Sequence, residues 1–389
     1  MTSLPRTPGE VRWHGVDRDS ELARLCEGWL AEGDRPLAID TEFVRERTFY
    51  PHLGLVQIAD GDRIYLLDTE AIGELEPLAA ILRQPGIPKI VHSCSEDLEV
   101  FHHRLGVLPE PIFDTQIAAG LAGLRPSMGY GVLVHELFGI QLPKAHTRSN
   151  WLKRPLSEAQ LRYAALDVVF LLEIHRRLHR RLEDKGRLAW VQEDGCRLLD
   201  PGRFEVDGDE AVYRKIGRGR RLHPRQLAAL RVLCAWRVDE ARRRDLPRNF
   251  VLEEGALAPL TQRRPTDRRQ LERIRELDRR TADRYGDTLL ELIQQAEALP
   301  VEELPDPLPP GLDLTPHKAM VKKLRKRVAE LAESLDLAPE LLATRKTVEG
   351  LLRRHLRGAE PTLPRSLRGW RQEVVGRPLL ELLATYPAA

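Results

Sequence analysis

The stretch "PLAIDTEF" at residues 36–43 decides how the first part of this 389-residue chain folds. Its side chains alternate between two sets, a period of two that is typical of a β-strand. Asp40 and Glu42 then share one face, where like charges repel each other. Either water solvates both carboxylates, or a compensating cation such as Mg²⁺ or Mn²⁺ lies between them. The stretch alone leaves both interpretations open.

The pattern around this strand predicts an α/β domain with a mixed sheet. Residues 53–60 and 63–68 predict two further strands, and the turn signal "GDR" between them predicts a hairpin. Two more strands and five helices complete the predicted domain, the strands at 89–93 and 111–115 and the helices at 75–84, 95–106, 115–122, 130–139 and 157–185.

After residue 200 the strand patterns stop and helical patterns take over. A Pro-rich stretch at 301–316 predicts a linker between two small helical modules. The helices predicted for these modules are 222–247, 268–298, 317–333, 339–355 and 367–385.

The charge and the cysteine content of the chain indicate some classes of protein and exclude others. Residues 1–200 contain 24 Lys and Arg against 30 Asp and Glu, a net charge of −6, whereas residues 201–389 contain 37 against 29, a net charge of +8. A basic second half indicates a part that binds a polyanion. No apolar run is long enough to span a membrane, and no secretory leader is visible. The four cysteines are too widely spaced for a zinc cluster or a disulfide framework, so we expect a reducing cytoplasm.

A third carboxylate stands in "HSCSED" at residues 92–97, where Asp97 falls at the start of a predicted helix. Ser93 and Glu96 have the spacing of a capping box for that helix. Asp97 is then either an acid that stabilises the helix start through the helix dipole, or a ligand-binding side chain at the carboxyl edge of the sheet.

A fourth carboxylate, Asp167, follows Tyr163 by four residues, so both lie on one face of the predicted helix 157–185. Ser157 and Gln160 form a capping-box pattern at the start of this helix. Asp167 lies in the apolar segment "LRYAALDVVFLL" and needs a partner, either an arginine or a metal. With Asp40, Glu42 and Asp97, it can form a pocket for two divalent ions, which assist displacement at phosphorus.

These motifs resemble those of the DEDD superfamily of exonucleases, in its Tyr-type subgroup, and most specifically the ribonuclease D family. The resemblance covers about residues 10–200 and rests on four segments in order: "DTEFVRERTFYPHLGLVQIA", "HSCSEDLEVF", "FDTQIAAGL" and "LRYAALDVVFLLEIH". Further on, "LHPRQLAALRVLCAWRVDEARRRDLPRNFVL" resembles a helicase-and-RNase-D C-terminal (HRDC) module, and "LDLAPELLATRKTVEGLL" with "LRGWRQEVVG" resembles a divergent second one.

The resemblance implies an α/β mixed-sheet, ribonuclease H-like exonuclease domain followed by two all-α helical modules. We expect the exonuclease domain at 1–205 and the HRDC-like modules at 206–300 and 317–389. The implied activity is metal-dependent 3′→5′ hydrolysis of RNA that releases nucleoside 5′-monophosphates. The implied substrates have a single-stranded 3′ end, as in tRNA precursors and other small stable RNAs. We expect a monomer without an organic cofactor or a membrane partner.

The resemblance also implies roles for the five motif residues. Asp40, Glu42, Asp97 and Asp167 hold two divalent ions, Mg²⁺ or Mn²⁺, and Tyr163 orients the attacking water. Two ions between Asp40 and Glu42 explain how these carboxylates tolerate each other.

Several residues near these motifs are candidate RNA contacts. Phe43 follows the first motif and Gln57 lies on the neighbouring predicted strand. The loop before the last helix of the predicted domain combines cationic side chains with an aromatic one, as sites that bind single-stranded nucleic acid do. These side chains are Lys144, Arg148, Trp151 and Arg154. An ordinary solvated loop would have the same composition, and the family often has an acid where this chain has Asn150.

Two alternative functions stay open. The first is a 3′→5′ exonuclease that acts on DNA, because nothing in the carboxylate set distinguishes ribose from deoxyribose. The second is a non-catalytic nucleic-acid-binding protein that uses its helical modules. A zinc hydrolase built on His92, His102 and His103 is disfavoured, because their spacing does not match a ligand triad.

Overall fold

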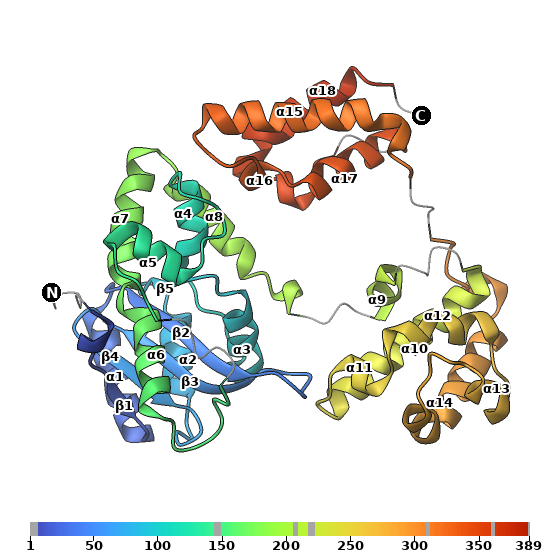
Figure 1. Ribbon diagram of the computed structural model, residues 1–389, viewed down its shortest axis with the longest axis horizontal. Helices are drawn as coiled ribbons and strands as arrows, with labels where there is room; N and C mark the ends of the chain where they lie inside the picture. Colours follow the sequence, from blue (N-terminus) through green and yellow to red (C-terminus); the bar gives the residue numbers. More distant parts are fainter. Residues whose placement is uncertain are drawn as a thin grey trace. The chain divides into compact units, whose positions relative to one another are not determined.

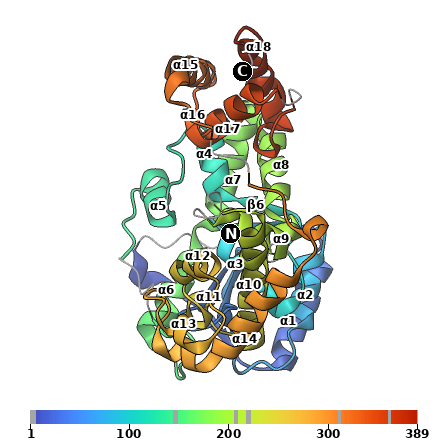
Figure 2. The ribbon, with the colours of Figure 1, turned by 90° about the vertical axis from the view of Figure 1, so that its right-hand side faces the viewer.

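The chain divides into two compact units in a computed structural model that describes residues 7–143, 149–204, 209–216, 222–308, 312–358 and 362–387. Figure 1 and Figure 2 show the ribbon from two directions. Unit 1 is formed by 1–44, 52–200 and 313–389, and unit 2 by 45–51 and 201–312. No helix in these described ranges is long and apolar enough to cross a membrane.

A six-stranded mixed sheet forms the centre of unit 1 (Figure 1), in the order β1-β4-β3-β2-β5-β6. Strand β2 pairs antiparallel with β3, and β3 antiparallel with β4, which confirms the predicted hairpin. The other pairs are parallel. The strands are β1 (His14–Val16), β2 (Leu37–Val44), β3 (His52–Ala59), β4 (Ile64–Asp68), β5 (Lys89–Val91) and β6 (Ile112–Asp114).

In the described residues, eight α-helices of unit 1 come from the same part of the chain as the sheet. Helix α6 packs on β2, β3 and β4, α3 on β2 and β3, and α7 on β2 and β5 (Figure 1). These helices are α1 (Asp19–Glu32), α2 (Glu76–Arg83), α3 (Ser95–Leu105), α4 (Thr115–Leu121), α5 (Tyr130–Phe138), α6 (Glu158–Val169), α7 (Leu171–Asp184) and α8 (Leu188–Leu198). The predicted mixed-sheet domain is therefore confirmed, although β1, α1 and α8 were not predicted.

The helix predicted at 157–185 is two helices, because the chain breaks at Phe170 between α6 and α7. The hydroxyl of Tyr130 fills the break: it donates to the carbonyl of Leu166 at 3.0 Å and accepts from the amide of Phe170 at 3.2 Å. A side chain from α5 thus satisfies backbone groups that a continuous helix would pair internally. Periodicity could not reveal this distant partner.

The last helices of the chain also belong to unit 1. They are α15 (Lys318–Ser334), α16 (Pro339–Leu342), α17 (Arg345–Leu356) and α18 (Arg377–Ala384). The rings of Trp370 and Trp190 stack with centroids 4.1 Å apart and planes 4° apart. Arg371 forms two hydrogen bonds with Asp194, at 2.6 Å and 2.9 Å. This C-terminal module is therefore joined to α8 by specific contacts.

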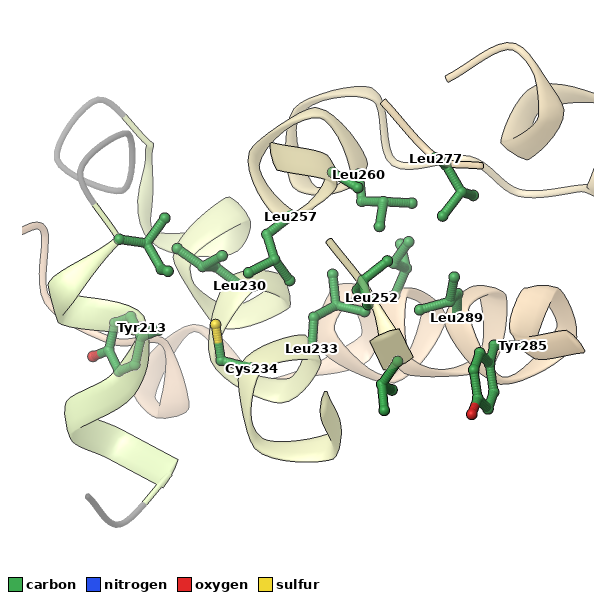
Figure 3. Packing of buried hydrophobic residues seen from close by; sticks show 14 of the residues in the cluster. Tyr213, Leu230, Leu233, Cys234, Leu252, Leu257, Leu260, Leu277, Tyr285 and Leu289 are labelled. Atoms are coloured by element: carbon green, nitrogen blue, oxygen red, sulfur yellow. The ribbon is translucent and has the colours of Figure 1, made fainter. Parts of the chain in front are cut away.

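Unit 2 is a helical module built around α10 and α14, which lie side by side (Figure 2). Its core contains large apolar side chains such as Leu230, Leu233, Leu257 and Leu289, all fully buried (Figure 3). The helix predicted at 268–298 is broken, and Asp278 caps the second part by accepting from the amide of Thr281 at 3.0 Å. The helices are α9 (Asp209–Lys215), α10 (Pro224–Arg243), α11 (Arg248–Val251), α12 (Glu254–Arg263), α13 (Arg268–Glu272) and α14 (Arg279–Ala298).

Residues 45–51, which connect β2 to β3, are part of unit 2. The ring of Phe49 is buried in the core of that unit. The amides of Phe49 and Tyr50 donate to the carboxylate of Asp245 at 2.9 Å and 3.0 Å. Unit 2 therefore contains two segments of the chain, the β2–β3 connection at 45–51 and residues 201–312.

Candidate active site

Strand β2 carries the first two carboxylates, as the alternation predicted. Its residues Leu37, Ala38 and Ile39 are buried, whereas Asp40 and Glu42 are partly exposed. Strand β5 is short and pairs with β2 at Leu37 and Ala38. The remaining length of β2 therefore has β3 on one side and leaves room for α3 on the other.

Asp97 lies in the first turn of α3 and is joined to β2 by a hydrogen bond from the hydroxyl of Thr41. This bond stabilises the charged form of the carboxylate. The strand and the helix thus bring Asp97 next to Asp40, whose pKa responds to its charge.

The predicted capping box of α3 is wrong. Ser93 lies outside the helix with a left-handed backbone (φ 57°), and the N-cap residue Cys94 forms no side-chain cap. The carboxylate of Asp114, at the end of β6, instead accepts from the amides of Ser93 and Cys94, both at 3.2 Å. The same carboxylate caps α4 by accepting from the amides of Gln116 at 2.8 Å and Ile117 at 3.3 Å.

Asp114 is a residue whose role the sequence did not reveal, although it stands in the quoted segment "FDTQIAAGL". It is 3% exposed, and it fixes the start of the helix that carries Asp97. A carboxylate that accepts four backbone N–H groups is strongly held in place. The signal was an Asp followed directly by a helical pattern, which is typical of an N-cap.

Tyr163 and Asp167 lie on α6, which packs across β2, β3 and β4. The predicted capping box is confirmed: the hydroxyl of Ser157 accepts from the amide of Gln160 at 3.3 Å, and the Gln160 side chain accepts from the amide of Ser157 at 3.1 Å. The side chains of Tyr163 and Asp167 are joined by a hydrogen bond, as their i and i+4 positions allow.

All four carboxylates have a raised pKa, and burial is the largest cause for each. Burial, and then the charges of Asp97, Asp167 and Glu42, raises the pKa of Asp40 well above its usual range. Burial and the charges of Asp167 and Asp97 raise the pKa of Glu42 to about 9. Burial raises the pKa of Asp167 to about 7, against the lowering effect of the Tyr163 hydroxyl. Burial raises the pKa of Asp97 to about 6. The site therefore brings together four acids whose charged forms are disfavoured unless a cation compensates them.

The cationic side chains that the structure describes do not neutralise this cluster. Among the described residues, no Lys or Arg forms an ion pair with any of the four carboxylates. Arg154, a nearby cation in the sequence, is paired with Asp68 instead. Hard oxygen ligands in a cluster of this charge fit divalent cations such as Mg²⁺ or Mn²⁺.

Within the described part of the chain, no three His, Cys, Asp or Glu side chains are arranged to hold a metal ion as they stand. The fit to metal therefore rests on the chemistry of the donors.

The other residues that the sequence suggested as RNA contacts have different surroundings in the structure. Gln57 is fully buried directly opposite Asp40 on β3, and its amide N and O have no hydrogen-bond partner among the described residues. Phe43 is partly exposed and follows a β-bulge after Glu42. Trp151 is 1% exposed and Arg154 binds Asp68, so both are engaged inside the fold. Lys144 and Arg148 lie outside the described residues.

Comparison with known proteins agrees with this arrangement. Residues 13–183 match the family described as 3′-5′ exonuclease, residues 226–293 match the HRDC domain, and residues 316–379 match the ribonuclease D C-terminal HRDC domain. Fold and family together define the class: a 3′→5′ exonuclease followed by helical HRDC domains.

Relatives of nearly equal length give the particular family. The chain is 45% identical to ribonuclease D of Pseudomonas paraeruginosa over 381 residues, which cover 97% of this chain and 98% of the relative. It is 39% identical to ribonuclease D of Escherichia coli over 378 residues, 97% of this chain and 100% of the relative. The crystal structure of E. coli RNase D, an exoribonuclease involved in structured RNA processing, has a TM-score of 0.89 at 38% identity and covers 97% of this chain. The chain belongs to the ribonuclease D family of 3′→5′ exoribonucleases.

Proposed function

We propose that this enzyme uses two divalent ions to hydrolyse RNA from its 3′ end and releases nucleoside 5′-monophosphates. The observation that carries the proposal is the group of four carboxylates with raised pKa values that no described cation neutralises. Its substrates are tRNA precursors and other small stable RNAs with a single-stranded 3′ end. A cytoplasmic location fits the four cysteines, all of which are free thiols.

The carboxylates of Asp40, Glu42, Asp97 and Asp167 are the residues that would hold the ions. When bound, Mg²⁺ or Mn²⁺ supplies positive charge for the attacking and leaving oxygens of an in-line displacement at phosphorus. The hydrogen bond from Thr41 favours the charged form of Asp97 and so opposes the effect of burial on its pKa. The bond from Tyr163 does the same for Asp167 on α6.

Tyr163 is suited to orient the attacking water. Burial and the charges of Asp167 and Glu42 raise the pKa of its phenol, so the hydroxyl keeps its proton at neutral pH. A protonated hydroxyl can donate to Asp167 and accept from a water, and thereby fix the direction of the water's lone pair. Water attacks the terminal phosphodiester, the bond from phosphorus to the 3′ oxygen breaks, and that oxygen leaves with a proton.

Gln57 is suited to bind the substrate or a water at the same face of the sheet. Its buried amide has no partner among the described residues, which costs free energy unless a ligand supplies one. Phe43 lies next to this face and is exposed enough to contact a terminal base. In α15, the side chains of Lys322, Lys323 and Arg325 are exposed and could contact the RNA backbone.

A time course on a 5′-labelled RNA with a single-stranded 3′ tail, beside the same sequence as DNA, tests this proposal. We expect a ladder that shortens from the 3′ end, nucleoside 5′-monophosphates by thin-layer chromatography, and no products after chelation with EDTA. Equal rates on DNA would favour the deoxyribonuclease alternative. Nucleoside 3′-monophosphates, or cleavage inside the chain, would contradict the proposed reaction.

A further inference from the structure

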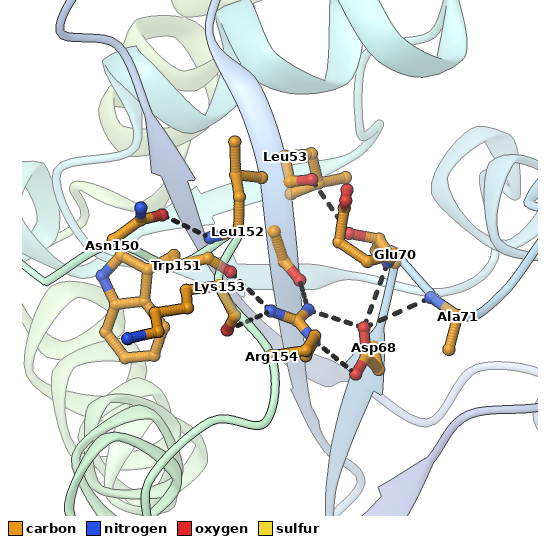
Figure 4. A network of polar contacts seen from close by, with 11 residues as sticks. Leu53, Asp68, Glu70, Ala71, Asn150, Trp151, Leu152, Lys153 and Arg154 are labelled. Atoms are coloured by element: carbon orange, nitrogen blue, oxygen red, sulfur yellow. Dashed lines mark hydrogen bonds and ion pairs between the residues drawn. The ribbon is translucent and has the colours of Figure 1, made fainter.

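The loop that precedes α6 is fixed to the sheet by the side chain of Arg154. Its guanidinium donates to both oxygens of Asp68, at the end of β4, at 2.6 Å each. It also donates to the carbonyl of Gly54 on β3 at 2.7 Å and to the carbonyl of Trp151 at 2.7 Å (Figure 4). One side chain therefore connects the loop to two neighbouring strands.

Asp68 is a suitable anchor for this arginine. It also accepts from the amides of Glu70 at 3.1 Å and Ala71 at 3.3 Å, which hold its carboxylate in place (Figure 4). Although burial raises the pKa of Asp68, the hydrogen bonds and charge of Arg154 lower it overall. The planar fork of arginine matches both carboxylate oxygens, which a lysine ammonium cannot do.

The loop approaches β3 so closely that a side chain would not fit at Gly54. A Cβ atom at Gly54 would lie 2.5 Å from the carbonyl oxygen of Trp151. Trp151 itself is 1% exposed, and its ring lies beside that of Tyr163, with centroids 6.1 Å apart and planes 34° apart. The carbonyl that Arg154 binds belongs to the residue that packs against Tyr163.

We propose that Arg154 and Asp68 are positioning residues for Tyr163. They hold Trp151 against the ring of Tyr163, so the phenol hydroxyl stays directed at Asp167. This inference rests on the proposed role of Tyr163 in orienting the attacking water. It replaces the expectation that Arg154 and Trp151 grip RNA, because both side chains are engaged within unit 1.

Two substitutions separate positioning from an RNA contact. Arg154→Lys keeps the charge that would attract a phosphate but loses the paired hydrogen bonds to Asp68. Asp68→Asn removes a negative charge, and the loss of a negative charge cannot weaken the attraction of the protein for RNA. We expect each variant to lower the single-turnover rate at saturating RNA and metal about tenfold, with an unchanged Kd for RNA. The double variant is no slower than either single one.

The Tyr163→Phe background makes the test specific. Without the hydroxyl, Arg154→Lys and Asp68→Asn should lower the rate by less than about twofold. A matched control is Arg35→Lys, since Arg35 bridges Glu32 at 3.0 Å and Asp62 at 2.7 Å in the same unit. We expect this control to leave the rate unchanged. Equal losses in both backgrounds, or a weaker Kd for RNA in Arg154→Lys alone, would overturn the proposal.

A physical readout keeps the inference independent of the reaction. In protein labelled with 3-fluorotyrosine, Tyr163→Phe assigns one of the seven tyrosine ¹⁹F resonances. This resonance should shift or broaden in Arg154→Lys and in Asp68→Asn but not in Arg35→Lys. An unchanged resonance would overturn the positioning role. If the resonance moves but Tyr163→Phe reacts at the wild-type rate, positioning stands and the proposed role of Tyr163 fails.

Discussion

Asp40 on β2 and Gln57 on β3 lie directly opposite each other, and the buried amide of Gln57 has no hydrogen-bond partner among the described residues. Cross-strand partners share one face of a sheet, so the uncompensated carboxylate and the unpaired amide are next to each other. An unpaired buried amide destabilises the free protein. This pair marks the face of the sheet that is suited to a polar ligand.

Replacing Gln57 by Met should therefore make the protein more stable and at the same time weaken its function. Met has a similar volume and no unpaired polar group, so we expect the free energy of unfolding to rise by about 1 kcal/mol. The KM for RNA should rise, because the proposed ligand of the amide loses its partner. Denaturant unfolding and steady-state kinetics check this together. A variant that is less stable, with unchanged KM, would show that Gln57 is only a packing residue.

Tyr163→Phe should lower the single-turnover rate by about 10²–10⁴-fold with little change in RNA affinity. The hydroxyl is assigned to orienting the water, which contributes to the transition state and not to binding of the ground state. Quench-flow on a labelled RNA and a filter-binding isotherm measure the two effects. If single-turnover rates match those of the wild type, Tyr163 serves packing alone.

The metal-free protein should become less stable between pH 7 and pH 8. The pKa of Glu42 is about 9 in the folded protein, above its ordinary value, so the folded state keeps a proton that the unfolded chain has released. Stability then falls as pH rises toward that pKa, by about 1.4 kcal/mol per pH unit for each such proton. Asp167, with a pKa of about 7, adds part of a second proton at the start of this range.

Thermal unfolding of wild type and Glu42→Gln at both pH values, with and without Mg²⁺, checks this pH dependence. We expect Glu42→Gln to flatten the slope, and Mg²⁺ to raise the Tm of the wild type more at pH 8 than at pH 7. A wild-type protein that gains stability from pH 7 to pH 8 would contradict the assigned direction.

Asp114→Asn should impair the site through α3. The amide keeps one oxygen but turns an NH₂ group toward backbone amides, so we expect a loss of about 1–3 kcal/mol of stability and a higher Mg²⁺ concentration for half-maximal activity. Asp60→Asn is a matched control, because Asp60 is also buried and accepts from the amides of Asp62 at 2.9 Å and Arg63 at 2.8 Å. The control should lose stability without a change in Mg²⁺ dependence, and an equal change in both would refute the role of Asp114.

The sequence predicted the parts of the site that depend on local periodicity. The alternation in β2 placed Asp40 and Glu42, and the i and i+4 spacing placed Tyr163 with Asp167. It could not predict contacts between distant segments. Three contacts each join residues at least 20 positions apart: the bond from the Cys94 amide to Asp114 just before α3, the bond of Tyr130 at the Phe170 break, and the pairing of Arg154 with Asp68. The composition of its loop predicted that Arg154 contacts RNA. In the structure, Arg154 instead pairs with Asp68, which lies far away in the sequence.

The most direct test of the central claim, that the four carboxylates hold catalytic metal, is a titration with Mn²⁺ followed by electron paramagnetic resonance and by RNA cleavage. We expect the wild type to bind two ions per chain and to become active over the same range of concentration. Asp40→Asn and Asp167→Asn should lose bound Mn²⁺ and all cleavage. Their Tm without metal should be equal to or above that of the wild type, because each substitution removes an acid whose charged form the folded protein disfavours. A folded Asp40→Asn variant that binds two ions and cleaves RNA at near the wild-type rate would contradict the claim.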